Sequence, residues 1–190
     1  MTATMTRRPH TRTAAAAGLL LALAAASALA LGVLPLGAAE AEQSIVVEPL
    51  TPRAEFTDDV AVQLRNKFDG RGTDVMNLRD ASNIAVAKIT IQPGAVIPWH
   101  THPGPILITI AEGDGDGAFV YVLADDCVER SYTPGQALID AGGDNVHTAY
   151  NPSKTDQTVV IATFLDAPAE GPLTLPVEGP DPDVCPLPSP

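Results

Sequence analysis

Apolar and polar residues alternate along many short segments of this chain. In residues 105–111, Ile106, Ile108 and Ile110 occupy every second position, which places them on one face of a β-strand. Segments of the same β-rich kind lie at residues 44–50, 60–64, 84–91, 95–102, 118–124, 128–133, 137–140, 146–150 and 157–165. No helix of useful length is expected beyond the N-terminal region, so the pattern predicts an all-β protein.

Turn-forming residues separate these segments. Pro-Gly pairs stand at 93–94, 103–104 and 134–135, and the segments 112–117 and 141–144 are rich in Gly and Asp. Many short strands at even spacing, each bounded by Gly or Pro, are typical of an antiparallel sandwich or barrel.

The first 41 residues follow a different pattern. Three arginines precede an almost wholly apolar segment at 14–36, and the small residues Ala39 and Ala41 follow it. A basic head, an apolar middle and a small-x-small end indicate a secretory signal peptide at 1–41. We therefore expect a secreted or periplasmic protein that leaves the membrane after cleavage. The alternative is a permanent anchor, since the apolar segment is long enough to span a bilayer.

The remaining length suits one domain. We divide it into N-terminal strands and a linker at 42–80, a barrel at 81–166 and a Pro-rich tail at 167–190. Eight residues of this tail are proline, which excludes a helix or a central strand there.

The charge of the chain is strongly negative. Its 23 acidic and 11 basic residues give a formal net charge of −12, and removal of residues 1–41 takes away more bases than acids. Such a charge argues against nucleic acid and anionic membrane surfaces as partners.

Two cysteines, Cys127 and Cys185, are present. In an exported chain a pair of cysteines indicates one disulfide, which here would fix the tail to the barrel. A redox pair or a thiolate ligand is the alternative, although the chain has no CxxC spacing and neither cysteine lies near the histidines in sequence.

After the predicted cleavage site, the chain keeps three histidines, His100, His102 and His147. His100 and His102 are two residues apart on a predicted strand, so they point to the same face, away from Trp99 and Thr101. Neutral imidazoles that converge in this way can bind one metal ion. A His-x-His pair by itself is equally consistent with two partly buried or surface histidines.

Two motifs surround these histidines in chain order. The first consists of Gly94, five further residues, the sequence His100-Thr101-His102-Pro103-Gly104, and Gly113. The second consists of Gly135, Gly143, His147 and Asn151. Together they resemble the two motifs of the cupin superfamily, over residues 84–165.

The resemblance implies a double-stranded β-helix, or jelly roll, with the three histidines in the barrel mouth. It implies one divalent ion, of Fe, Mn, Zn, Ni or Cu, and it implies that Asn151 supports the turn after its strand. Cupins commonly pair through their sheets, so a homodimer is an open expectation.

Three positions depart from the cupin pattern. Ile106 stands where a fourth ligand, Glu, is usual, Ala141 replaces a proline, and one residue is inserted before His147. Without the carboxylate, the ion would keep its full charge and hold water or an anion in its open positions. Three histidines suffice for catalytic zinc, and some cupin dioxygenases use three with iron. Ile106 is expected to shape a ligand pocket, whereas Ile108 and Ile110 pack the core.

These observations predict an exported metallo-cupin that binds or acts on a small organic molecule. The reaction would be oxygen insertion, isomerisation or a lyase step, and its catalytic residues are left unassigned. Asp140 and Tyr150 lie nearest the motifs as candidate bases, but each is expected to be structural. The alternatives are a non-catalytic binding module and a structural or storage cupin without metal.

Overall fold

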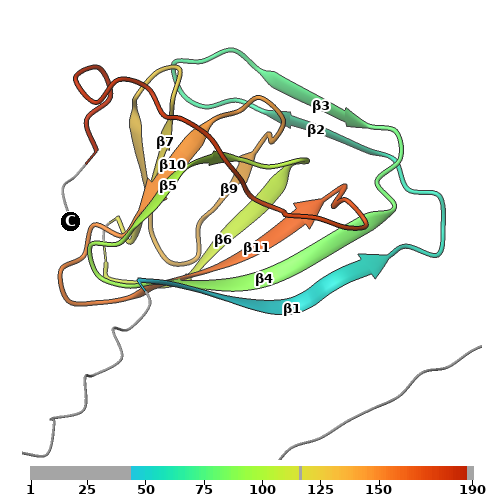
Figure 1. Ribbon diagram of the computed structural model, residues 1–190, viewed down its shortest axis with the longest axis horizontal. Helices are drawn as coiled ribbons and strands as arrows, with labels where there is room; N and C mark the ends of the chain where they lie inside the picture. Colours follow the sequence, from blue (N-terminus) through green and yellow to red (C-terminus); the bar gives the residue numbers. More distant parts are fainter. Residues whose placement is uncertain (1–43, 116, 188–190) are drawn as a thin grey trace, which may run out of the picture. The chain divides into compact units, whose positions relative to one another are not determined.

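The computed structural model describes residues 44–115 and 117–187 (Figure 1). One five-stranded sheet has the spatial order β1 (Ile45–Glu55), β4 (Asn83–Ile91), β11 (Thr158–Leu165), β6 (Ile106–Glu112) and β9 (Ala137–Asp140). The other has the order β12 (Leu175–Pro176), β5 (Val96–Thr101), β10 (His147–Tyr150), β7 (Phe119–Leu123) and β8 (Glu129–Tyr132). A separate hairpin joins β2 (Val62–Asn66) to β3 (Asp74–Leu78). Every strand pair is antiparallel, and the all-β prediction is confirmed.

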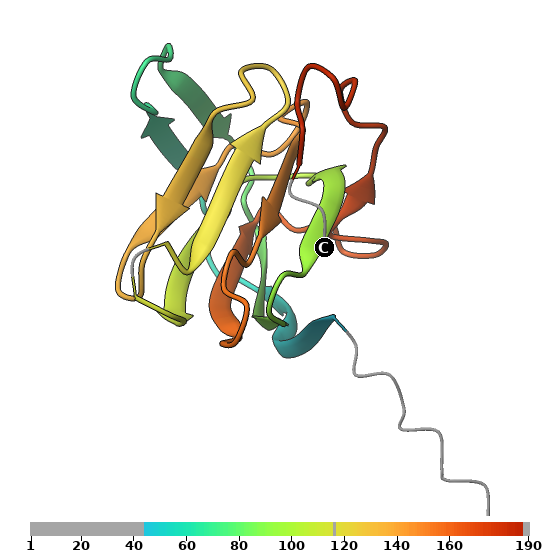
Figure 2. The ribbon, with the colours of Figure 1, turned by 90° about the vertical axis from the view of Figure 1, so that its left-hand side faces the viewer.

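From β4 onward the chain passes repeatedly between the two sheets. Strands β4, β6, β9 and β11 belong to the first sheet, while β5, β7, β8, β10 and β12 belong to the second. The two sheets face each other across a shared interior (Figures 1 and 2). This alternation is the connectivity of a double-stranded β-helix, so the predicted jelly roll is confirmed.

The interior is filled by the apolar side chains that alternate along each strand. On β6, Ile106 and Ile110 are buried whereas Leu107 is 37% exposed. The buried positions of both sheets form one cluster, to which β4, β7 and β11 also contribute. Burial of this apolar surface is the main stabilising term of such a barrel.

The N-terminal part contains more strand than the sequence pattern predicted. Strand β1 continues to Glu55, past the expected end at residue 50, because its register with β4 shifts near Pro49 and again after Thr51. An edge strand tolerates proline at such irregularities, since its outer side makes no ladder bonds. Residues 55–80 yield two strands instead of one, and these strands pair only with each other in the described chain.

The Pro-rich tail covers the outer face of the second sheet. Cys185 is buried there with Val120, Val122 and Tyr150, and Trp99 packs against them. Cys127 and Cys185 form a disulfide across a sequence separation of 58 residues, with their Cα atoms 5.4 Å apart. The tail contributes only the two-residue strand β12, at the edge of its sheet.

Removal of the disulfide is expected to destabilise the protein by about 4 kcal/mol, because the cross-link shortens the free loop of the unfolded chain. A Cys127→Ser, Cys185→Ser double variant should show this loss in equilibrium urea unfolding. The wild-type protein under reducing conditions should match the variant. Equal stability of the oxidised protein and the variant would contradict the predicted contribution.

Candidate metal centre

The second sheet brings the three histidines together. His100 lies near the end of β5, His102 follows two residues later, and His147 opens the neighbouring strand β10 directly opposite His100. Because alternate residues of a strand point to one face, His100 and His102 both point into the barrel. One ring nitrogen of each histidine lies within 4.8 Å of the others, and all three residues are at most 6% exposed.

The Nδ1 atom of each imidazole faces an oxygen. His100 Nδ1 lies 2.7 Å from the Pro98 carbonyl oxygen, and His102 Nδ1 lies 2.7 Å from that of Leu173. His147 Nδ1 lies 3.1 Å from the Asn145 carbonyl oxygen. A carbonyl oxygen can only accept a hydrogen bond, so each Nδ1 carries the proton. Nε2 is then the nitrogen with the free lone pair that a metal ion requires.

Burial keeps the rings of His100 and His102 neutral. Burial lowers the pKa of His100 to about 4, and a charge on the adjacent His147 ring would lower it further. Burial likewise lowers the pKa of His102 to about 4, against the opposing effect of its hydrogen bond to the Leu173 carbonyl. At neutral pH both side chains therefore offer a lone pair instead of a positive charge.

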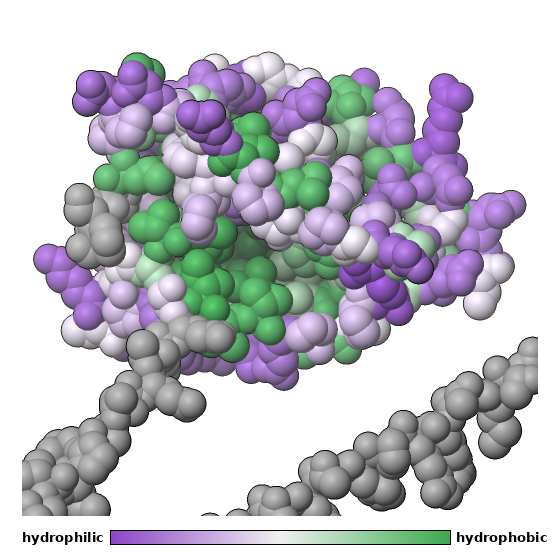
Figure 3. All heavy atoms as spheres, in the orientation of Figure 1, coloured by the Kyte–Doolittle hydropathy of each residue, from purple (hydrophilic) through white to green (hydrophobic). Residues whose placement is uncertain are grey.

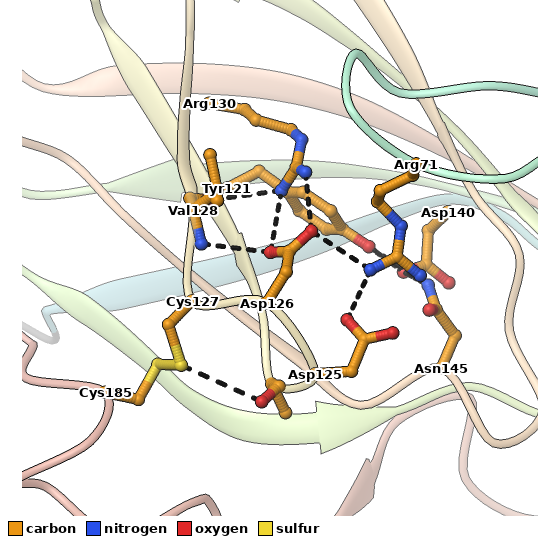
Figure 4. Close-up of polar contacts among 11 residues, drawn as sticks. Arg71, Tyr121, Asp125, Asp126, Cys127, Val128, Arg130, Asp140, Asn145 and Cys185 are labelled. Atoms are coloured by element: carbon orange, nitrogen blue, oxygen red, sulfur yellow. Dashed lines mark hydrogen bonds and ion pairs between the residues drawn. A yellow bond between two sulfur atoms is a disulfide. The ribbon is translucent and has the colours of Figure 1, made fainter.

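A buried carboxylate orients His147. Asp140 is fully buried at the end of β9, and its Oδ2 lies 2.9 Å from His147 Nδ1. The Tyr121 hydroxyl donates to the same oxygen at 2.5 Å, and Asn145 Nδ2 lies 3.2 Å from it (Figure 4). Burial raises the pKa of Asp140, but hydrogen bonds from His147 and Tyr121 outweigh it, so the pKa falls below its ordinary value. Asp140 is thus an ionised acceptor behind His147.

Asp140 and Tyr121 correct the sequence analysis in part. Asp140 has a structural role, as expected, but it also belongs to the site because its carboxylate bonds and orients His147. Tyr121 was not singled out, although the alternation of β7 places it on the inner face; its ring centre lies 5.0 Å from that of His147. Tyr150, the other candidate base, donates its hydroxyl to Glu129 instead.

Ile106 and Asn151 are the two remaining motif positions. Ile106 is 1% exposed and lines the same cavity as the histidines. Asn151 supports the turn after β10: its Nδ2 donates to the carbonyls of Ile91 and Asp156, and its Oδ1 accepts from the Ser153 N–H. Whether the three histidines bind a metal stays a prediction.

The three histidines line an apolar cavity of about 280 Å³. Besides the histidines, its walls are formed mainly by aliphatic and aromatic side chains: Ile45, Val47, Ile89, Ile97, Ile106, Ile108, Phe119, Ala149, Val160, Ala162 and Phe164. Tyr121 and Thr174 complete the lining. Figure 3 shows an apolar hollow at the centre of the molecular surface that is turned toward the viewer. Ile106 fills the place where the cupin pattern has a carboxylate, so the described cluster is three histidines alone.

The Pro-rich tail takes part in this site, which the sequence pattern did not indicate. Its Leu173 carbonyl accepts from His102 Nδ1, and Thr174 lines the cavity. Arg53 on β1 holds the preceding residues by donating Nε to the Pro168 carbonyl and Nη2 to the Gly171 carbonyl, each at 2.8 Å. The tail is therefore a fixed wall of the site.

An ionic cluster holds the β2–β3 hairpin loop against the barrel behind Tyr121. Arg71 Nη1 donates to Asp125 at 2.5 Å and to Asp126 at 3.0 Å, and Arg130 Nη2 donates to Asp126 at 2.7 Å (Figure 4). The Arg130 guanidinium also lies 4.8 Å from the centre of the Phe68 ring, which stacks on Tyr121.

Asp126 is expected to contribute stability that acid removes. Partial burial raises its pKa, but hydrogen bonds from Arg130, the Val128 N–H and Arg71 lower it from 3.8 to about 2. The contribution is therefore complete above pH 3.8 and lost as the pH falls toward 2. Asp126→Asn should lower the melting temperature at pH 6 and match wild type at pH 2. A gap between the two proteins that stays constant down to pH 2 would contradict this assignment.

Comparison with known proteins adds only a likeness of fold. No protein-family model and no curated protein matches the chain. A cupin-like protein from Thermotoga maritima is 20% identical over 53% of this chain and 68% of its own, with a TM-score of 0.42. KdgF from Halomonas sp. is 17% identical over 68% of this chain and 86% of its own, with a TM-score of 0.43.

The polyketide cyclase RemF from Streptomyces resistomycificus is 19% identical over 50% of this chain, with a TM-score of 0.41. The match spans 61% of the cyclase, which is less than two thirds of its length. At such values these likenesses say nothing about the substrate of this chain. The fold assignment rests on the sheet topology itself.

Proposed function

We propose that this chain, a cupin by its topology and histidine motifs, binds one divalent metal ion through His100, His102 and His147 and presents it to a small organic molecule. The proposal includes export, with residues 1–41 as the signal peptide; that segment lies outside the described residues.

The main support for this proposal is that ring nitrogens of all three histidines lie close together. One ring nitrogen of each histidine lies within 4.8 Å of those of the other two, and with Nδ1 protonated the acceptor nitrogen of each ring is Nε2. Acceptor nitrogens gathered in this way favour a metal cation, or a hydrogen-bond donor such as water, between them. Three imidazoles are a sufficient protein ligand set for catalytic zinc and also suit Fe, Mn, Ni and Cu.

The surrounding residues support such a site. Asp140 and the carbonyls of Pro98, Leu173 and Asn145 fix the ring orientations and tautomers, as outer hydrogen-bond partners do in metalloproteins. The apolar walls limit the entry of water. When bound, the ion would supply Lewis-acid polarisation of an oxygen atom on the small molecule.

A non-catalytic ligand-binding role is the second candidate, because the cavity offers no free base. Asp140, the nearest carboxylate, is fully buried and already accepts hydrogen bonds from Tyr121 and from the Gly142 N–H. A reaction would therefore need its proton transfers to pass through the substrate or bound water. Oxygen insertion, isomerisation and lyase chemistry all stay within the proposal.

One further observation agrees with export. The disulfide between Cys127 and Cys185 suits an oxidising compartment. None of the described residues belongs to a helix with the length and apolar character that a membrane crossing requires.

Metal analysis of the protein tests the proposal directly. The exported protein should be purified without chelator or histidine tag and analysed for Fe, Mn, Zn, Ni and Cu. We expect about one ion per chain, or uptake of one ion when the chelator-treated protein is titrated. Absence of metal in both experiments would overturn the metal-binding proposal and favour the second candidate.

A further inference from the structure

We infer that the ligand of this site is a largely apolar molecule whose body carries no charge and which offers one oxygen atom to the three histidines. This inference deepens the proposed function and rests on it only for the role of that oxygen. The cavity itself decides the rest of the ligand's chemistry.

The cavity walls offer almost no polar partner. Besides the three histidines, only Tyr121 and Thr174 bring a side-chain hydroxyl to the lining. The Tyr121 hydroxyl is already bonded to Asp140 and receives a contact from Asn145 Nδ2 at 3.3 Å. A sugar or another polyhydroxylated molecule would lose its water bonds on entry and find too few replacements, which is energetically costly.

The cavity walls also carry no charged side chain. Asp140 lies behind His147 and Tyr121 and is fully buried. Among the described residues no lysine or arginine lines this cavity, so an organic anion would have no protein cation there to balance its charge. A bound divalent ion could balance acidic groups only beside the histidines. Burial of an unpaired charge is costly enough to exclude dianions and charged chains from the body of the cavity.

The shape of the space indicates the size of the ligand. The volume of about 280 Å³ lies just below the range for small-molecule sites, roughly 300–1,000 Å³. A second hollow of about 400 Å³ shares Val47, Ile89, Phe164 and Thr174 with it and is also lined by Arg53, whose guanidinium donates to three backbone carbonyls. A small ring system or a short hydrocarbon chain with one hydroxyl or carbonyl fits the first volume.

Strand β6 supplies a matched pair of variants for the test. Ile108 is buried and lines the cavity, whereas its neighbour Leu107 points outward and is 37% exposed. Ile108→Asn adds a polar group to the cavity, and Leu107→Asn adds the same group to the surface. Ala162→Leu is a second test, because it fills cavity space with an apolar side chain and introduces no polar group.

Calorimetric titration of the zinc-loaded and metal-free protein with three probes tests the inference. We expect 1-naphthol, a neutral aromatic alcohol, to bind both forms, and the zinc-loaded form more tightly. Glucose should bind neither form, and 1-naphthoate should fail to bind the metal-free form. Ile108→Asn and Ala162→Leu should each weaken 1-naphthol binding at least about tenfold, whereas Leu107→Asn should not.

The outcomes separate this inference from the proposed function. Zinc uptake by Ile108→Asn and Ala162→Leu, measured in the same samples, shows that these variants are folded and that the histidines still bind. If zinc binds but glucose binds in preference to 1-naphthol, or if Leu107→Asn weakens 1-naphthol as much as Ile108→Asn does, the inference is wrong and the metal site stands. If no zinc binds but 1-naphthol still enters the cavity, the ligand class stands and the metal proposal fails.

Discussion

Replacement of His147 by alanine is expected to reduce the affinity for a divalent metal by more than about a hundredfold. Loss of a group that only supports a ligand already costs about 10–100-fold, and loss of a ligand should exceed that range. His147 is the histidine that both β5 and β7 flank, since it pairs with His100 on one side and with Leu123 on the other. Its removal leaves two nitrogens, too few to hold the ion in a fixed geometry.

Metal titration of His147→Ala, followed by calorimetry or by competition with a chromogenic chelator, measures this effect. Tyr150→Phe is the matched control on the same strand, because the Tyr150 hydroxyl bonds Glu129 and does not line the cavity. We expect Tyr150→Phe to retain wild-type affinity. If His147→Ala takes up one ion per chain as tightly as this control, the ion lies elsewhere.

Replacement of Asp140 by alanine should have the largest effect on stability, a loss of about 3–5 kcal/mol, as expected when one partner of a buried charged network is removed. Four groups contact this carboxylate: the Tyr121 hydroxyl, the Gly142 N–H, His147 Nδ1 and Asn145 Nδ2. The Tyr121 hydroxyl and the Gly142 N–H would lose their acceptor in a region without solvent, at about 1–3 kcal/mol each. His147 would keep only its contact with the Asn145 carbonyl, so metal affinity should also fall about 10–100-fold.

Urea unfolding of the metal-free protein separates the two effects of Asp140. Tyr121→Phe removes the hydroxyl that donates to Asp140 and accepts from Asn145, and it should cost about 1–2 kcal/mol. Metal affinity should change little, since the bond between Asp140 and His147 stays in place. A stability of Asp140→Ala within 1 kcal/mol of wild type would show that water or another group replaces the carboxylate, contrary to the assigned role.

Ile106 relates the metal site to the proposed ligand. A carboxylate at this position would add a fourth ligand. It would also place a negative charge in the cavity, which is lined by the histidines and by apolar side chains. Isoleucine keeps this wall apolar while leaving the ion its full charge. Under the proposed function, the same replacement therefore favours both a stronger Lewis acid and a ligand with an apolar body.

The local pattern of the sequence determined most of the strands and the inward direction of the motif residues. A period of two fixes which face each residue occupies, so Ile106 and Ile108 could be placed on an apolar inner face from the sequence. The His-x-His spacing placed two imidazoles on one side of β5 for the same reason. The disulfide followed from the presence of two cysteines in a chain with a predicted export signal.

Only the tertiary structure decided which distant segments meet. The bond between Asp140 and His147 depends on the turn at residues 141–146, and Tyr121 reaches both from a different strand. The Leu173 carbonyl bonds His102 across 71 residues, because the tail returns along the barrel and is fixed by Arg53 and the disulfide. Such contacts leave no periodic signal, since they depend on long-range chain return and on single polar atoms. The sequence thus determined the three histidines and the apolar wall, and the fold decided what orients and encloses them.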